Sequence, residues 1–114
     1  MIPRNCHLWL NQNITANEID LASVKDYWDH SHVWRYLAKC KECGQLYVHD
    51  NVESVDWLAG NDKIFTTIVP VSEAELEEHD FSKLSPTELL KFSPILLLSP
   101  DDKLTWINNN VLNN

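Results

Sequence analysis

The segment AKCKECGQLY, Ala38 to Tyr47, decides how the fold is interpreted. Cys40 and Cys43 are separated by two residues, and a glycine follows the second cysteine. The flanking runs VWRYLAK at 33–39 and QLYVHD at 45–50 are rich in strand-forming residues. The segment therefore predicts a β-hairpin whose tip carries a Cys-x-x-Cys-Gly loop.

Such a loop is typical of zinc knuckles, in which two thiolates hold one metal ion. The glycine permits a positive φ and lets the backbone approach sulfur closely. No second Cys-x-x-Cys follows, so Cys6, the remaining cysteine, is the expected third ligand. The alternatives are three ordinary reduced thiols or a redox pair. A redox pair needs a helix N-terminus that lowers the pKa of its first thiol, and strand-like residues stand there instead.

A histidine is the expected fourth ligand. A straight strand over 33–39 would place His32 roughly 26 Å from Cys40, at about 3.3 Å per residue. His7 has no such restraint because it adjoins Cys6. A thiolate-rich set favours a closed, structural zinc site over a catalytic one. The predicted zinc ligands are Cys6, Cys40, Cys43 and His7, with His32 as the alternative fourth ligand.

Three segments carry the signature of a capping box, in which Ser or Thr precedes Glu by three positions. The pairs are Thr15 with Glu18, Ser72 with Glu75, and Ser85 with Glu88. We expect helices over 16–29, 73–79 and 86–92. In the first and longest, an apolar stripe would consist of Leu21, Val24 and Trp28.

Further strands are predicted at 63–71, where KIFTTIVPV is β-branched, and at 94–98 and 103–108, which the turn SPDD joins. The expected order is helix, hairpin, strand, two short helices and hairpin. We predict one α+β domain over residues 1–114, with a mainly antiparallel sheet, an N-terminal helix, two short helices and a zinc-knuckle-like hairpin.

The net charge of −8 is concentrated in residues 42–80, which hold ten Asp or Glu and one Lys. An acidic surface is a poor partner for nucleic acid and a good one for a basic protein. The longest apolar run, PILLL, is too short to span a membrane, and no signal peptide is recognisable. We therefore expect a cytoplasmic protein that binds neither nucleic acid nor membranes.

The runs HVWRYLAKCKECGQLYVHD, VDWLAGNDKIFTTIVPV and LSPTELLKFSP resemble a group of small bacterial proteins. Cys-x-x-Cys-Gly-Gln-Leu-Tyr and Gly-Asn-Asp are the most specific shared pieces, and the resemblance covers most of the chain. It connects the sequence with immunity proteins of contact-dependent growth inhibition and related toxin systems. The resemblance implies a cytoplasmic antitoxin that blocks one cognate toxin. The sequence departs from the group after Tyr47, where VHDNVES keeps only part of an aromatic and acidic pattern.

An acidic surface suits that implied function. Many such toxins are nucleases, whose substrate-binding surfaces are basic, so carboxylates on an inhibitor would speed encounter and fix orientation. An aromatic side chain among them could anchor the complex. The predicted partner-binding residues are Asp50, Glu53, Asp56, Trp57 and Asp62.

Two other function classes compete with an immunity protein. One is a zinc-stabilised interaction module for a different partner. The other is a small metal-dependent hydrolase that uses His30, His32 and His49 as metal ligands, or His32 as a general base beside Asp50. No catalytic motif supports a hydrolase, and two glycines in the whole chain exclude a glycine-rich phosphate loop. We rank the inhibitor first and expect no catalytic residue.

Overall fold

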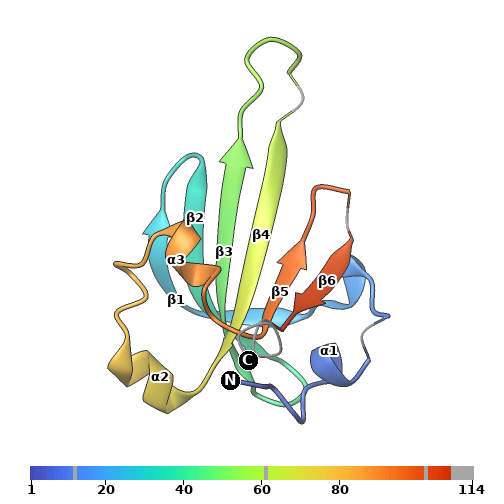
Figure 1. Cartoon of the computed structure of the whole chain (residues 1–114), viewed down its shortest axis with the longest axis vertical. Coiled ribbons are helices and arrows are strands. Elements are labelled where there is room, and N and C mark those ends of the chain that lie inside the picture. Colours follow the sequence, from blue (N-terminus) through green and yellow to red (C-terminus); the bar gives the residue numbers. More distant parts are fainter. Residues whose placement is uncertain (12, 61, 102, 109–114) are drawn as a thin grey trace.

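The computed structural model describes residues 1–11, 13–60, 62–101 and 103–108. Within these residues six strands form one antiparallel sheet in chain order, so each strand pairs with its neighbours in sequence (Figure 1). The strands are β1 (Leu21–Asp29), β2 (Val33–Cys40), β3 (Leu46–Ser54), β4 (Lys63–Val71), β5 (Ile95–Leu98) and β6 (Leu104–Ile107). The predicted antiparallel sheet and both predicted hairpins are confirmed.

The described helices are short. They are α1 (His7–Leu10), the 3-10 turn η1 (Ala16–Glu18), α2 (Glu73–Glu78) and α3 (Pro86–Leu89). Two of the three predicted capping boxes form as expected: the side chains of Ser72 and Ser85 each accept a hydrogen bond from the backbone N–H three residues later. Helix α3 ends at Leu89, three residues before the predicted end.

The predicted helix over 16–29 is wrong. Only η1 is helical, and residues 21–29 form β1 at an edge of the sheet. The β1–β2 register shifts twice, between Ser23 and Lys25 and between Asp26 and Trp28. Such bulges break the two-residue alternation of a strand, so the apolar spacing imitated a helical stripe. Pairing with β2 outweighed the local capping signal, which reflects how strongly strand formation depends on context.

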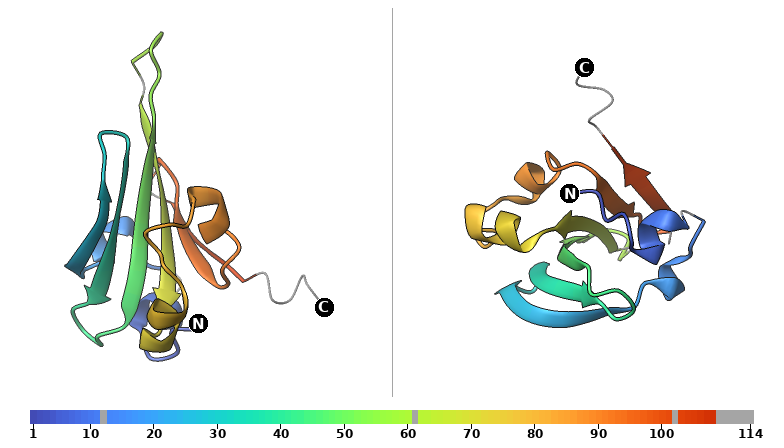
Figure 2. Two further views of the ribbon diagram at one scale, coloured as in Figure 1. Left: turned by 90° about the vertical axis from the view of Figure 1, so that its left-hand side faces the viewer. Right: turned by 90° about the horizontal axis from the view of Figure 1, so that it is seen from below.

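The two faces of the sheet bury separate apolar clusters. Successive residues of β3 show the division, because Tyr47 packs with the N-terminal segment whereas Val48 packs with the α2–α3 segment. Phe81 and Leu89 bring the segment around α2 and α3 into the second cluster. Figure 2 shows α2 and α3 gathered at one side of the molecule and α1 at another. The sheet is thus covered by two different stretches of chain.

A buried ion pair connects the centre of the sheet to the α2–α3 segment. Arg35 on β2 is 0% exposed, and its Nε donates a hydrogen bond of 2.8 Å to Asp50 on β3, which is 1% exposed. The Nη1 of Arg35 donates to the carbonyls of Phe81 and Leu84, and the guanidinium lies 4.0 Å from the ring centroid of Trp28. One side chain therefore holds two strands and the chain before α3 together.

Replacing Arg35 with Met should lower the free energy of unfolding by about 3–5 kcal/mol, because Asp50 would remain buried and uncompensated. Urea denaturation followed by circular dichroism measures this loss. Lys41→Met is the matched control, since it removes the exposed pair that Lys41 makes with Asp20, for which a loss below about 1 kcal/mol is expected. Equal losses in the two variants would contradict this account of the core.

Candidate functional site

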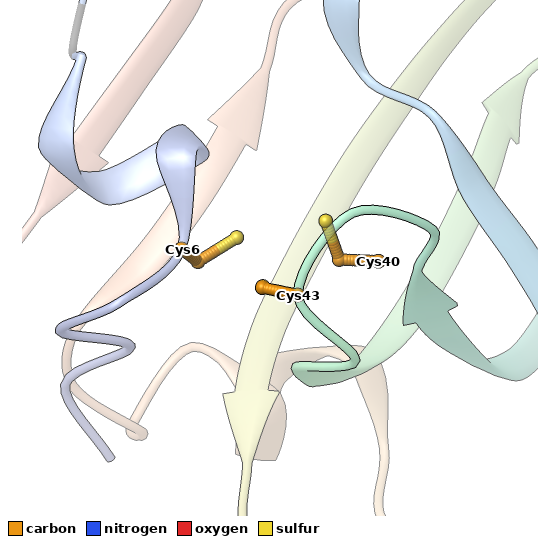
Figure 3. Close-up of side chains that lie close together, drawn as sticks. All are labelled: Cys6, Cys40 and Cys43. Atoms are coloured by element: carbon orange, nitrogen blue, oxygen red, sulfur yellow. The ribbon is translucent and has the colours of Figure 1, made fainter.

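Three cysteine sulfur atoms lie within 4.8 Å of one another, although they come from two distant stretches of sequence. Cys40 ends β2 and Cys43 lies in the turn that leads to β3, while Cys6 immediately precedes α1. Cys6 and Cys40 are buried and Cys43 is exposed. Figure 3 shows Cys6 on the N-terminal segment facing the turn that carries the other two. This cluster could hold a metal ion.

The turn between β2 and β3 is closed by backbone hydrogen bonds around Cys40. The Cys40 N–H donates to the Gln45 carbonyl at 2.9 Å, and the Gly44 N–H donates to the Cys40 carbonyl at 2.9 Å. Gly44 has a φ of 80°, a conformation that residues with a side chain rarely adopt. The glycine thus turns the chain as the sequence predicted, which brings Cys43 back toward Cys40.

Contacts with β6 hold Cys6 in place. The indole Nε1 of Trp106 donates to the carbonyl of Leu8 at 2.8 Å, a bond that joins residues 98 positions apart. The rings of Trp9 and Trp106 meet edge to face at 4.9 Å, and Leu8 is fully buried. The N-terminal segment is therefore docked by its own apolar side chains, and Cys6 reaches the turn as a consequence.

The Tyr47 hydroxyl is a buried polar group beside the thiols. It makes no hydrogen bond of standard geometry in the described part of the chain. Burial raises the pKa of Tyr47, and the adjacent Cys6 thiol adds to this shift. Burial also raises the pKa of Cys6 to about 12, which the Tyr47 hydroxyl and the Leu8 backbone partly offset. A metal-bound thiolate would offer the hydroxyl a stronger acceptor than the neutral Cys6 thiol beside it.

His7, the predicted fourth ligand, lies at the border of the cluster. Its Nδ1 is 3.7 Å from the Cys40 sulfur and 2.9 Å from a carboxylate oxygen of Glu42. His32, the alternative, is not near the cluster, because it lies beyond the opposite end of β2, where its Nδ1 is 2.8 Å from Glu53 Oε1. His7 thus lies next to one sulfur of the cluster, that of Cys40, whereas His32 lies at the other end of β2.

Two of the three histidines of the hydrolase alternative, His32 and His49, contact other side chains. His49 stacks on Tyr36 at 4.7 Å between ring centroids, and burial lowers its pKa to about 4. His32 is bonded to Glu53, and Asp50 is bonded to Arg35. The proposed general-base pair of His32 and Asp50 is therefore not assembled.

The predicted partner-binding residues separate into two groups. Asp50 is a correction to the expected acidic surface, because it is buried and bonded to Arg35. Glu53 is half-buried beside His32. The other three, Asp56, Trp57 and Asp62, belong to the connection between β3 and β4, which extends beyond the body of the molecule (Figure 1).

Two features of the site escaped sequence reasoning. The sequence pattern identifies Tyr47 only as a strand residue, although it follows Cys43 by four positions on the same hairpin. Leu58, fully exposed beside Trp57, was also missed. The available signal was closeness in sequence to a predicted site residue, Cys43 for Tyr47 and Trp57 for Leu58.

A scan against protein-family models, a search of curated proteins and a search of solved structures each gave no significant match. None of the helices in the described ranges has the length and apolar character that a membrane span requires.

Burial and pKa together predict an order of thiol reactivity in chelator-treated protein. At pH 8, iodoacetamide should modify exposed Cys43 first and Cys6 last, because Cys6 is buried and a pKa of about 12 leaves little thiolate. Peptide mass spectrometry over a time course gives the three rates. Equal rates for Cys6 and Cys43 would contradict the described packing of the N-terminal segment.

Proposed function

We propose that the protein is a binding protein of the immunity type, in which a structural zinc ion stabilises the domain and an acidic surface neutralises a basic, nuclease-type toxin domain. The observation that carries the zinc proposal is the convergence of three cysteine sulfurs within 4.8 Å. The proposed ligands are Cys6, Cys40, Cys43 and His7.

The donor set favours zinc and a structural role. Thiolates are soft ligands that select zinc over magnesium or calcium. Three thiolates and one imidazole would complete a tetrahedral site and leave no position for a reacting water. The buried Tyr47 hydroxyl beside the sulfurs supports a thiolate site, because a thiolate is a stronger hydrogen-bond acceptor than the neutral Cys6 thiol next to it. For His7 to bind the ion, its ring would exchange the contact with Glu42 for one with the metal.

The distribution of charge supports a protein partner. Residues 42–80 carry ten carboxylates and one Lys; Asp50 is buried, and the other nine carboxylates include Asp56 and Asp62 on the connection that extends from the sheet. Such a surface attracts a basic protein and repels the phosphates of nucleic acid. An inhibitor needs a rigidly held binding surface and no catalytic group. A domain stabilised by a metal ion at the start of β3, the end away from the β3–β4 connection, meets this need.

The polypeptide encoded directly upstream of this chain is the toxin candidate to test. We expect its C-terminal domain to be basic, to stop growth when expressed alone, and to be tolerated when this chain is co-expressed. The purified proteins should form a 1:1 complex in size-exclusion chromatography coupled to light scattering. Its dissociation constant, measured by calorimetry, should rise with salt because opposite charges meet across the interface.

Rescue of growth without a complex would contradict inhibition by direct binding. The absence of both rescue and complex would reject the immunity function for this pair. The control for nonspecific binding of a basic protein to an acidic one repeats both assays with the protein encoded directly downstream in place of the one encoded upstream.

A further inference from the structure

The end of the β3–β4 hairpin exposes a group of large apolar side chains. Trp57 is 87% exposed and Leu58 is 100% exposed, while Ile64 and Phe65 at the start of β4 are 42% and 49% exposed. Both figures show this hairpin extending beyond the other strands (Figures 1 and 2). Ile64 and Phe65 are consecutive residues of β4 and so face opposite sides of the hairpin, whereas Trp57 and Leu58 are neighbours in the turn between the strands. Single exposed apolar residues are common, but two adjacent, almost fully exposed ones on a projecting element mark a candidate interaction site.

The carboxylates of this region fix the backbone that presents the apolar side chains. Asp62 Oδ1 accepts a hydrogen bond of 2.8 Å from the Asp56 N–H. Asp56 Oδ1 in turn accepts from the N–H groups of Leu58 and Ala59, at 3.1 and 3.0 Å. Trp57 and Leu58 are therefore held outward on an ordered turn. A turn ordered before binding loses little conformational freedom when a partner covers it.

We propose that Trp57 and Leu58 insert into an apolar cleft rimmed by Lys and Arg on a protein partner. This inference rests on the proposed function and names the part of the surface that makes the contact. Most of the affinity comes from the two apolar side chains, while the acidic surface attracts the basic partner and orients it.

Charge identifies the partner. Asp56 and Asp62 both accept backbone hydrogen bonds within the turn that carries Trp57, so two carboxylates lie on that turn. Lys63 at the start of β4 adds one positive charge, which leaves this end of the hairpin acidic. Basic side chains at the rim of a cleft would pair with them, whereas nucleic acid would be repelled. A second copy of this chain, with a net charge of −8, would bring like charges together and is a poorer occupant.

The roles of the two residue types can be separated. Buried aromatic anchors carry most of the affinity of an interface, and charges at the rim mainly set the association rate and its dependence on salt. Replacing Trp57 and Leu58 should therefore raise the dissociation rate. Replacing Asp56 and Asp62 with Asn keeps an oxygen acceptor for the turn and removes only the charge.

The test uses the complex with the upstream-encoded domain. The double variant Trp57→Ser, Leu58→Ser should weaken binding by at least about 30-fold in calorimetry, as expected for a hot spot. Val24→Ser is the matched control, since Val24 is a half-exposed apolar residue on β1 at 53% exposure, and it should bind as the wild type does. The variant Asp56→Asn, Asp62→Asn should lose most of the salt dependence of the association rate.

A direct reporter comes from 5-fluorotryptophan labelling of the full chain. The fluorine resonance of Trp57, assigned with Trp57→Phe, should shift on complex formation and lose its sensitivity to a soluble paramagnetic quencher. Unchanged affinity of the Trp57 and Leu58 variant, together with an unmoved Trp57 resonance in a wild-type complex, would overturn this docking site and leave the proposed function standing. A wild type that binds nothing would overturn both.

Discussion

The contact between Cys6 and the β2–β3 turn holds the N-terminal segment against the end of β2 and the start of β3. Cys6 is far in sequence from this turn, yet its sulfur atom lies within 4.8 Å of the sulfur atoms of Cys40 and Cys43. Packing of Leu8 and Trp9 against β6 brings the N-terminal segment to the turn. A metal ion coordinated by thiolates from both segments would cross-link them. Without that link, burial of two thiols and a tyrosine hydroxyl would offer little specific attraction.

Strand β3 joins the two sites that matter for the proposed function. It begins next to the cysteine cluster, at Leu46, and ends at Ser54, where the projecting connection starts. At about 3.3 Å per residue, nine residues of strand place the two sites roughly 30 Å apart. The Arg35–Asp50 pair lies between them and ties β3 to the α2–α3 segment. Trp57 and Leu58 thus follow a strand that is held at its start by the cysteine cluster and in its middle by the Arg35–Asp50 pair.

Local signals predicted local structure well. The Cys-x-x-Cys-Gly turn, the capping boxes at Ser72 and Ser85, and the hairpins each depend on residues within a few positions of one another, so the sequence contains their full cause. The convergence of Cys6 with the turn was also predicted, because the cysteine count left one choice.

The failures share one physical origin, which is that tertiary pairing decided the outcome. Residues 21–29 became a bulged edge strand because β2 offered them a partner, and no local pattern records that offer. Asp50 was expected on an acidic surface, but the strand register placed it opposite Arg35, where the two charges are buried together. Sequence reveals how many carboxylates there are, whereas only the register reveals which of them face solvent.

The central claim is that the three cysteines bind one structural metal ion. Native mass spectrometry of the purified chain, before and after treatment with a chelator, tests it most directly. The account predicts one zinc ion per chain, its loss in Cys40→Ser, and a lowered melting temperature after chelation. A chain that carries no metal when purified from zinc-supplemented cells, and that melts at the same temperature with and without chelator, would contradict it.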